Sequence, residues 1–530
     1  MKRFGLKTLL ATASVALLLT GMPMMASAQE PQSGGTIVEL VSSEPPNLVG
    51  AFGGATTLHE ISDKIFDKLL EDKNGEYEPR LAESWEVSPD GRTFTFHLNP
   101  SVKWHDGTPF TSADVAFTMT EIWKKFGGIL AYGRITGVET PDEHTVVFKA
   151  ENQIAPQLLL GTLGNLQGLV LPKHIYENTD YKANPANLAP IGSGPYKFKE
   201  WVKGQYIVLE RNPDYYRKPY PYLDGIVVRF ERSANTRAAA LEAGDAHLGV
   251  RSPVALRDLD RIEKLDNLAY TAAGSEGAVW LQQMEVNLQH EITANPLVRK
   301  AIAHAINKEK LVSLVYAGHA KPATGPIPST IPSYTKDVDT YGFDPAKAEA
   351  LLDEAGYPRK SDGKRFPLKL VVGNWFETQS QSADLIAQDL ADVGIDVTID
   401  KPAIPAFIGQ VYKNYDFDIT LTNSVNYSEP GVGSLIWLWT KGIIPGVPWR
   451  NASHYSNPEM DAVIEASLVE QDPSKRMEQL HTFQKLAARD LPIIYLVEMD
   501  MINVYNKKLH NVGNHPRWYY TNWEDLWLEH

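Results

Sequence analysis

The chain is too long for a single hydrophobic core, yet no linker divides it. One core rarely serves more than about 250–300 residues, whereas this sequence has 530 residues. Between its halves we find no low-complexity stretch, and no repeat with a period of about 20–50 residues is visible. The sequence therefore predicts two or three domains in two lobes, with the chain passing between the lobes several times. Such an arrangement is typical of lobes that move about a hinge.

Local patterns in the first half predict strands and helices in close succession. A short apolar run over 36–41, bounded by Gly-Gly and by Ser-Glu-Pro-Pro, predicts a strand. The helical period over 58–70 predicts a helix, and alternating residues around a Ser-Pro-Asp-Gly turn over 85–98 predict a hairpin. Thr111 is followed three residues later by Asp114, which is the arrangement of a capping box and predicts the start of a helix.

The second half alternates helices and strands with clear end signals. Asn295-Pro296 and Asp344-Pro345 each offer an N-cap followed by proline at the first helical position. A helix expected over 382–394 leads directly into an apolar strand at 395–399, as in a sheet covered by helices. The fold class that follows is α/β, with mixed sheets covered by helices.

The N-terminal residues have the pattern of a secretory leader. Three basic residues precede an apolar run over 9–19, and Ala26-Ser27-Ala28 provides small residues for cleavage before Gln29. The alternative is a membrane anchor, which needs about 18–20 apolar residues. Neither this run nor any later uncharged segment is that long. We therefore expect an exported, soluble protein whose signal peptide spans 1–28.

Composition narrows the compartment and the partners. The sequence has no cysteine, which excludes disulfides, thiolate nucleophiles, cysteine zinc sites and a lipid-bearing N-terminal cysteine. An exported protein without an anchor is useful only where an outer barrier retains it, so we expect the bacterial periplasm. The 65 acidic residues against 51 Lys and Arg exclude nucleic acid as a partner, because phosphate contacts require a basic surface.

None of the short catalytic or cofactor motifs that we searched for is in the sequence. A phosphate-binding loop, a His-Glu-x-x-His zinc helix, a Gly-x-Ser-x-Gly elbow and an EF-hand loop are all missing, so we expect no metal and no cofactor. His105 beside Asp106 is the pair that most resembles a catalytic one. Its Asp-Gly-Thr-Pro context favours a structural turn, which leaves a periplasmic hydrolase as an alternative of another class.

Eight segments, in order along the chain, match phrases of one protein family. They are Leu81–Trp85, Pro89–Phe96, Lys103–Val115, Gly192–Tyr196, Val298–Ile302, Asp344-Pro345 with Ala355–Pro358, Tyr455–Asp461 and Leu491–Tyr495. These segments resemble the extracellular solute-binding proteins of family 5, which include the oligopeptide-, dipeptide- and nickel-binding proteins of ABC importers. The resemblance extends over nearly the whole chain after the leader.

The resemblance implies a two-lobed periplasmic-binding-protein-like fold with three domains. Domain I would combine residues 29–72, 188–281 and 498–530, domain II would be an insertion over 73–187, and domain III would be the second lobe over 282–497. Family members bind their ligand between domains I and III and close around it, so residues from both lobes must contact it. We expect a monomer that is not an enzyme and that delivers its solute to an ABC permease with ATPase subunits. A loaded protein that signals to a membrane receptor, or acts as a chaperone, is a further alternative.

The loop at 426–430 bears on the ligand. Peptide binders of the family carry a loop resembling Asp-Tyr-x-x-Pro, whose aspartate pairs with the free ammonium of the peptide. Here the stretch is Asn426-Tyr427-Ser428-Glu429-Pro430, and a buried ammonium without a charged partner is costly. Segment 373–379, where some peptide binders place a basic residue for the peptide carboxylate, has no Arg. We expect a ligand other than a peptide with a free N-terminus. The alternatives are that Glu429 replaces the missing carboxylate, or that the protein is an oligopeptide- or dipeptide-binding protein proper.

Aromatic rings and neutral amides gather in the same part of the sequence. The candidate ligand-binding residues are Trp375, Phe376, Asn423, Asn426, Tyr427, Trp437 and Trp439, with Trp280 and Phe52 from segments near the domain I side of the cleft. Asn426 can donate and accept neutral hydrogen bonds. At least one of Trp437 and Trp439 is expected in the core. Rings beside amides suit a sugar, an aromatic compound or another polar organic solute with little charge.

Overall fold

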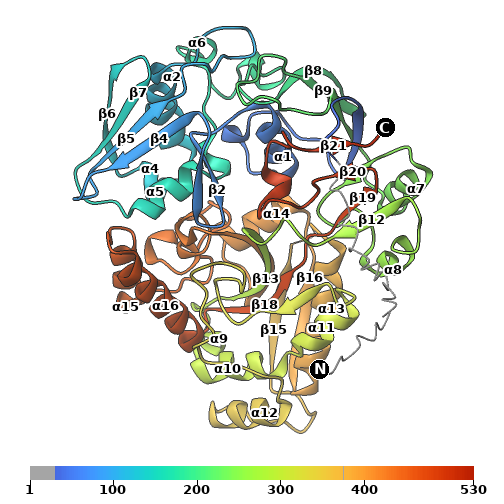
Figure 1. Cartoon of the computed structure of the whole chain (residues 1–530). Helices are drawn as coiled ribbons and strands as arrows, with labels where there is room; N and C mark the ends of the chain where they lie inside the picture. The colour runs from blue at the N-terminus through green and yellow to red at the C-terminus, as the bar shows by residue number, and fades with distance from the viewer. Residues whose placement is uncertain (1–29, 374) are drawn as a thin grey trace, which may run out of the picture.

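Two lobes stacked on one another make up the chain. The computed structural model describes residues 30–373 and 375–530, and the expected leader over 1–28 lies outside these residues. Lobe 1, the upper body in Figure 1, holds residues 30–271 and 503–530, and lobe 2 below it holds residues 278–499. Within the described ranges, no helix is long and apolar enough to cross a membrane.

Lobe 1 contains two sheets. The larger has seven strands in the order β12-β19-β11-β1-β10-β9-β8. These are β1 (Thr36–Val41), β8 (Tyr196–Val202), β9 (Tyr206–Arg211), β10 (Gly225–Phe230), β11 (Leu248–Gly249), β12 (Leu268–Thr271) and β19 (Asn503–Asn506). The smaller is antiparallel, with the order β4 (Ala82–Val87), β5 (Thr93–Leu98), β7 (Thr145–Ala150) and β6 (Ile135–Asp142). The larger sheet thus joins the N-terminal strand, a middle segment and the C-terminal segment.

Short helices and hairpins complete lobe 1. The helices are α1 (Thr56–Ile65), α2 (Ser112–Phe117), α4 (Ile129–Tyr132), α5 (Pro156–Leu163), α6 (Lys173–Tyr176), α7 (Ala234–Ala243) and α8 (Leu259–Ile262). Strands β2 (Leu70–Lys73) and β3 (Glu76–Pro79) form a hairpin that extends down to lobe 2 in Figure 1. Strands β20 (Leu509–His510) and β21 (Trp527–Leu528) pair near the C-terminus.

Lobe 2 is built on one mixed sheet in the order β14-β18-β13-β17-β15-β16. Its strands are β13 (Ala278–Val286), β14 (Ala320–Pro322), β15 (Phe366–Val372), β16 (Ile395–Asp400), β17 (Ile419–Tyr427) and β18 (Ile493–Met499). The main helices are α10 (Pro296–Ala305), α11 (Lys308–Leu314), α12 (Pro345–Glu354), α13 (Glu377–Asp392), α15 (Pro458–Ser467) and α16 (Pro473–Asp490). All nine residues of β13 are buried, so this strand runs through the middle of the lobe's core.

The two lobes are joined by two crossings of the chain, at 272–277 and 500–502. The sequence predicted several crossings. The structure has two, because the chain enters lobe 2 once and only the C-terminal segment returns to the first sheet. The α/β fold class with two lobes is confirmed. The expected domain boundaries at 281/282 and 497/498 fall inside β13 and β18, which belong to one sheet. The division of the chain at those positions stays a prediction.

Several local predictions are confirmed, and two helix ends differ. Thr111 and Asp114 form the expected capping box at α2, and Asn295 and Asp344 each accept a backbone hydrogen bond at the start of a helix. The first helix ends at Ile65 rather than near residue 70. The carbonyl of Ile65 accepts a hydrogen bond from the backbone of Gly194, at 2.8 Å, in place of one from a continuing helix. Helix α13 begins at Glu377, five residues before the expected start.

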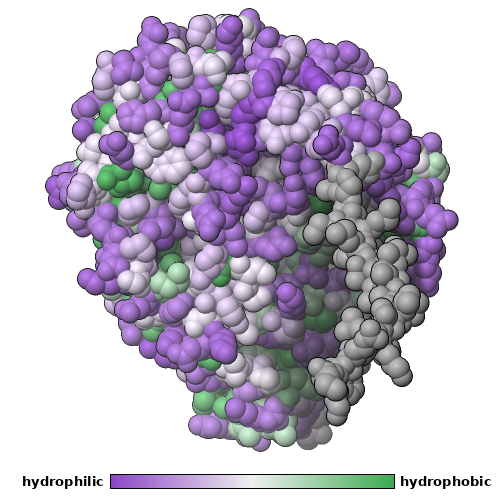
Figure 2. Space-filling model, in the orientation of Figure 1, coloured by the Kyte–Doolittle hydropathy of each residue, from purple (hydrophilic) through white to green (hydrophobic). Residues whose placement is uncertain are grey.

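The visible surface is mostly polar. Figure 2 shows hydrophilic residues over most of this face and only small apolar patches between them. Apolar residues are instead collected in three buried clusters, of which the largest extends through both lobes. The lobes therefore pack against each other over part of their facing surfaces.

Candidate ligand site

The ends of β13 and β17 that point to lobe 1 lie at the boundary between the lobes. Ala278 on β13 is paired with Tyr427 on β17. The hydroxyl of Tyr519, from the C-terminal segment of lobe 1, donates to the carbonyl of Ala278 at 2.7 Å. Ser428, directly after β17, donates to the carboxylate of Asp72 in the β2–β3 hairpin. These contacts place the first residue of β13 and the last residue of β17 next to lobe 1.

The lobes also touch at the outer edge. The backbone of Ala155 donates to Leu468 at 3.0 Å, and the side chain of Gln471 donates to the carbonyl of Ile154 at 3.0 Å. Both contacts join the inserted part of lobe 1 to the α15–α16 region of lobe 2. With the inner contacts they hold the lobes in a closed arrangement, as expected of a protein that closes over its ligand.

Two buried amides face each other on neighbouring strands near this boundary. Gln282 on β13 is opposite Asn423 on β17, a position in which side chains lie about 4.5–5.5 Å apart at Cβ. All four side-chain amide atoms are buried and form no hydrogen bond with any described residue. An unmet buried polar group costs about 1–3 kcal/mol. The pair is therefore unfavourable in the closed protein unless a ligand or solvent supplies partners.

An aromatic wall stands beside the amides. Trp280 lies two residues before Gln282, so both side chains are on the same face of the sheet. The ring of Phe376 meets that of Trp280 edge to face, with centroids 5.6 Å apart. Gln379, in the first turn of α13, accepts hydrogen bonds from the backbone of Phe376 and Trp375, while its buried Nε2 has no partner among the described residues. Together these groups form what we call the amide patch: Trp280, Gln282, Phe376, Gln379 and Asn423.

Asn426 and Tyr427 point in different directions. Asn426 is three residues from Asn423 and therefore lies on the opposite face of β17. Its Nδ2 donates to Ser424 at 3.1 Å and its Oδ1 accepts from Ser434 at 2.7 Å. Tyr427 shares the face of Asn423, and burial raises the pKa of its hydroxyl well above the usual range. Tyr427 is thus the member of this pair that borders the amide patch.

The remaining aromatic candidates are held elsewhere. Trp375 packs edge to face on Phe407 and Trp449, with centroids 4.9 and 5.1 Å apart. Trp437 is 5% exposed and belongs to the largest core cluster, which is the core position expected for one of the two tryptophans. Phe52 packs on Phe126 and Tyr176 inside lobe 1. Trp375 reaches the amide patch through its backbone N–H, which donates to Gln379, while its ring packs elsewhere. A ligand-binding role for these three residues stays a prediction.

Trp439 lines a separate polar groove between the lobes. The groove has a volume of about 450 Å³. Its lining residues are Arg92, Arg134, Asn152 and Gln153 from lobe 1 and Trp439, Lys441, Glu465 and Val469 from lobe 2. The ammonium of Lys441 lies 4.9 Å from the centre of the Trp439 ring. This groove is at the outer edge of the boundary, whereas the amide patch is at the inner end of β13.

Glu429 is not available to a ligand. Its carboxylate forms a two-pronged ion pair with Arg476, at 2.7 and 2.9 Å, and accepts from the backbone of Gly431 at 2.8 Å. Both side chains are buried, at 3% and 5% exposure. The alternative that Glu429 takes over the role of the missing aspartate is therefore wrong, because its charge is already matched.

His105 and Asp106 do not form a catalytic pair. Nδ1 of His105 accepts from the backbone of Gly192 at 3.2 Å, and Nε2 contacts the carbonyl of Gly194 at 3.0 Å. Burial lowers the pKa of His105 to about 4, so the ring is neutral at neutral pH. Asp106 contacts His174 instead, at 2.8 Å. These bonds support the prediction that the turn at His105-Asp106 has a structural role. In the described ranges, no cluster of three or more His, Asp or Glu could hold a metal ion.

Sequence reasoning missed Gln282, Gln379 and the contact between Ser428 and Asp72. A signal for the first was present, because β13 is an apolar strand interrupted by Gln282, Gln283 and Glu285. Polar residues in a fully buried strand need partners, and such residues can be flagged before a structure is known. Gln379 gave no signal, since glutamine is common in helices.

Removing the hydroxyl of Ser428 is expected to weaken the closed state. The carboxylate of Asp72 accepts from the backbone of Gly75 within its own hairpin and from Ser428 across the boundary, so Ser428→Ala removes only the bond that forms when the lobes are closed. A bond to a charged group contributes about 1.5–3 kcal/mol. Ligand affinity should therefore fall about tenfold or more, as measured by fluorescence titration. Ser313→Ala, an exposed serine that bonds only within its own helix, serves as the control. Equal affinities for the two variants would contradict a role of this contact in closure.

Comparison with known proteins identifies the family. The model of the bacterial extracellular solute-binding proteins, family 5 (middle part), matches residues 76–445. The chain belongs to this family, whose members are solute-binding proteins of ABC importers rather than enzymes. The resemblance noted in the sequence is thereby confirmed.

Named relatives add detail. A protein of Brucella ovis that carries the name of an ABC transporter peptide-binding protein is 31% identical over 482 residues, covering 88% of this chain and 86% of the relative. The periplasmic binding protein DppA of Helicobacter pylori, solved with the peptide STSA, has a TM-score of 0.81 at 26% identity, over 94% and 99% of the two chains. The binding protein AgaA of A. tumefaciens R10, solved with agropinic acid, has a TM-score of 0.78 at 27% identity, over 94% and 99%.

Proposed function

We propose that this protein captures a polar organic solute with little net charge between lobes 1 and 2 in the periplasm, and delivers it to an ABC permease and its ATPase subunits. The observation that carries the proposal is the pair of buried amides, Gln282 and Asn423, beside the rings of Trp280 and Phe376. The two amides offer donors and acceptors but no charge. A ligand with amide or hydroxyl groups next to an apolar face would satisfy them.

Two features favour such a ligand over a peptide ammonium. The position that carries aspartate in peptide binders is Asn426, whose amide is bonded to two serines. The carboxylate of Glu429 is matched by Arg476. A free ammonium at this loop would therefore find no unpaired carboxylate at position 426 or 429. The second candidate is an oligopeptide- or dipeptide-binding protein, which is favoured by the name of the Brucella relative and by the peptide bound to DppA.

A titration with several ligand classes tests the proposal. Intrinsic tryptophan fluorescence should report binding, because Trp280 lies in the amide patch. The panel consists of peptides, oligosaccharides, opines and small aromatic acids. We expect saturable binding by a neutral or weakly charged polar solute. Tightest binding by peptides with a free N-terminus would favour the second candidate, and no saturable ligand for the folded protein would contradict a binding function.

Asn426→Asp is expected to shift selectivity toward cationic ligands. The new carboxylate would be buried, where a charged partner is worth far more than in water. The ratio of affinities for a cationic and a neutral member of the panel should rise by about tenfold, the effect of ~1.4 kcal/mol. Asn178→Asp, on the surface of lobe 1, is the control. Unchanged selectivity would show that the side chain at position 426 does not act on the ligand.

A further inference from the structure

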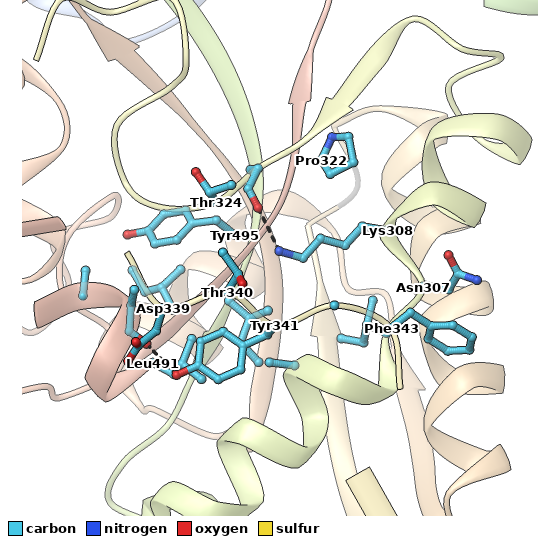
Figure 3. Close-up of a pocket in the computed structure, with 18 of the residues that line it drawn as sticks. Asn307, Lys308, Pro322, Thr324, Asp339, Thr340, Tyr341, Phe343, Leu491 and Tyr495 are labelled. Atoms are coloured by element: carbon cyan, nitrogen blue, oxygen red, sulfur yellow. Dashed lines mark hydrogen bonds between the residues drawn. The ribbon is translucent and has the colours of Figure 1, made fainter. Parts of the chain in front are cut away.

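A second hollow lies wholly inside lobe 2, away from the boundary between the lobes. It has a volume of about 210 Å³ and lies between α10, α11, the loop 339–343 and the start of β18 (Figure 3). Its apolar wall includes Ile306, Ala323, Ala487 and Leu491, all of them buried. None of the residues of the amide patch or of the outer groove lines it. The hollow is therefore separate from the site proposed above.

Side-chain bonds fix the walls of this pocket. The hydroxyl of Tyr341 donates to the carbonyl of Ala488 at 3.0 Å, which ties the loop to the end of α16. Nδ1 of His304, on α10, contacts the carbonyl of Gly342 at 2.7 Å. The middle of the loop is thus attached to α10 and to the end of α16, both in the same lobe. When the walls of a pocket are already fixed, binding does not lose the conformational entropy of ordering them.

The ammonium of Lys308 reaches into the middle of the pocket. Figure 3 shows it pointing toward Tyr495 and Thr340, with one hydrogen bond, to the carbonyl of Ala323 at 2.8 Å. Among the described residues, no carboxylate lies within ion-pair distance of it, and burial lowers the pKa of Lys308 to about 8. The next lysine along the chain, Lys310, has such a partner, because its ammonium contacts Asp389 at 2.8 Å.

The charges nearest to Lys308 do not compensate it. Asp339 and Glu309 also line the pocket, but both residues are exposed and neither forms an ion pair with the lysine. A mostly buried cation with a single neutral acceptor is an incomplete arrangement, since buried charges are normally paired. An anion small enough to enter the pocket would supply the missing charge.

We propose that this pocket is a second ligand site, which takes the carboxylate of a small organic acid at Lys308 and packs its apolar or aromatic part against Ile306, Leu491 and Tyr341. A volume of about 210 Å³ leaves room for a small organic acid. Since all of the lining belongs to lobe 2, binding here does not require the lobes to close.

A fluorinated probe tests the proposal. Binding of 4-fluorobenzoate to the full chain is followed by fluorine NMR at millimolar concentration, with neutral 4-fluorobenzamide as the matched ligand. Lys308→Met should weaken binding of the acid by about tenfold or more, the effect of losing a bond between charged groups. The amide should bind weakly and equally to both proteins. Lys336→Met, at an exposed lysine of the same lobe, should bind the acid as the unchanged protein does.

A second variant keeps the charge and fills the space. Thr340 lies on the exposed loop, so Thr340→Trp can occupy the pocket without altering the core, and it should abolish binding of the acid. Equal binding of 4-fluorobenzoate by the unchanged protein and by Thr340→Trp would overturn the proposal. No binding to the unchanged protein, or displacement of the probe by the solute that fills the amide patch, would overturn it as well. Loss of solute binding at the amide patch alone would count against the proposed function and leave this site untouched.

Discussion

Replacing Gln282 by leucine is expected to weaken ligand binding about a hundredfold while leaving the free protein at least as stable. The side-chain amide is fully buried and has no partner among the described residues. Leucine has a similar volume and carries no polar atom, so the unmet cost of about 1–3 kcal/mol disappears from the closed protein. A ligand group that paired with the amide is then left without a partner, which costs a comparable amount in binding.

The neighbouring glutamine provides a matched control. Gln283 is also buried, but it lies on the other face of β13 and accepts a hydrogen bond from Ser424 at 2.8 Å. Gln283→Leu removes this bond but also removes an Nε2 that has no partner among the described residues, so the free energy of unfolding should fall by no more than about 1 kcal/mol and affinity should stay nearly unchanged. Urea unfolding and the ligand titration measure the two effects. The amide patch is excluded as the ligand site if Gln282→Leu binds as well as Gln283→Leu.

Removing the guanidinium of Arg476 is expected to destabilise lobe 2 strongly. Arg476→Met leaves the carboxylate of Glu429 buried without its ion-pair partner, and breaking a buried pair from one side costs about 3–5 kcal/mol. Arg476 also donates to the carbonyl of Ser467 at 2.8 Å, so the start of α16 and the loop after β17 loosen together. The shift of the urea midpoint, followed by tryptophan fluorescence, measures the loss.

Two further variants separate the buried charge from other causes. The double variant Arg476→Met with Glu429→Gln removes both charges and should recover much of the lost stability, because no unpaired charge remains. Lys199→Met breaks the ion pair with Glu210, whose side chains are 57% and 48% exposed. The expected cost there is about 0–1 kcal/mol. If the double variant is no more stable than Arg476→Met, the buried charge is not the cause.

Features set by a few adjacent residues could be predicted from the sequence. The hairpin over 85–98 follows from alternation and a Ser-Pro-Asp-Gly turn, and it forms as expected. The helix starts at Thr111, Asn295 and Asp344 follow from side chains that bond the backbone two or three residues ahead. The two-lobed α/β fold and the family could also be anticipated, because the matching segments extend along most of the chain.

The candidate site was predicted only in part. Asn423, Trp280, Phe376 and Tyr427 were named in advance, and the structure gathers them on one face of the lobe 2 sheet. Gln282 was not named, because its relation to Asn423 depends on which residues of β13 and β17 are paired. That register is set between strands more than 130 residues apart, and no local pattern reports it.

Spacing in the sequence also could not show which side chains were already occupied. Asn426 has a bonding partner eight residues away and Glu429 has one 47 residues away. The sequence shows no partner for either side chain, whereas in the folded chain both are hydrogen-bonded. Trp375 and Phe376 are adjacent, yet they join different clusters because the chain turns between β15 and α13.

Sequence by itself determined where the capped helices after Thr111, Asn295 and Asp344 and the hairpin over 85–98 begin, and that no cysteine chemistry is available. These properties depend only on composition and on contacts between residues that are close together in the sequence. Only the tertiary structure decided that the first helix stops at Ile65, that Arg476 takes the charge of Glu429, and that Gln282 meets Asn423. Each of these depends on a hydrogen bond, an ion pair or a strand pairing between distant segments, and such contacts exist only once the chain has folded.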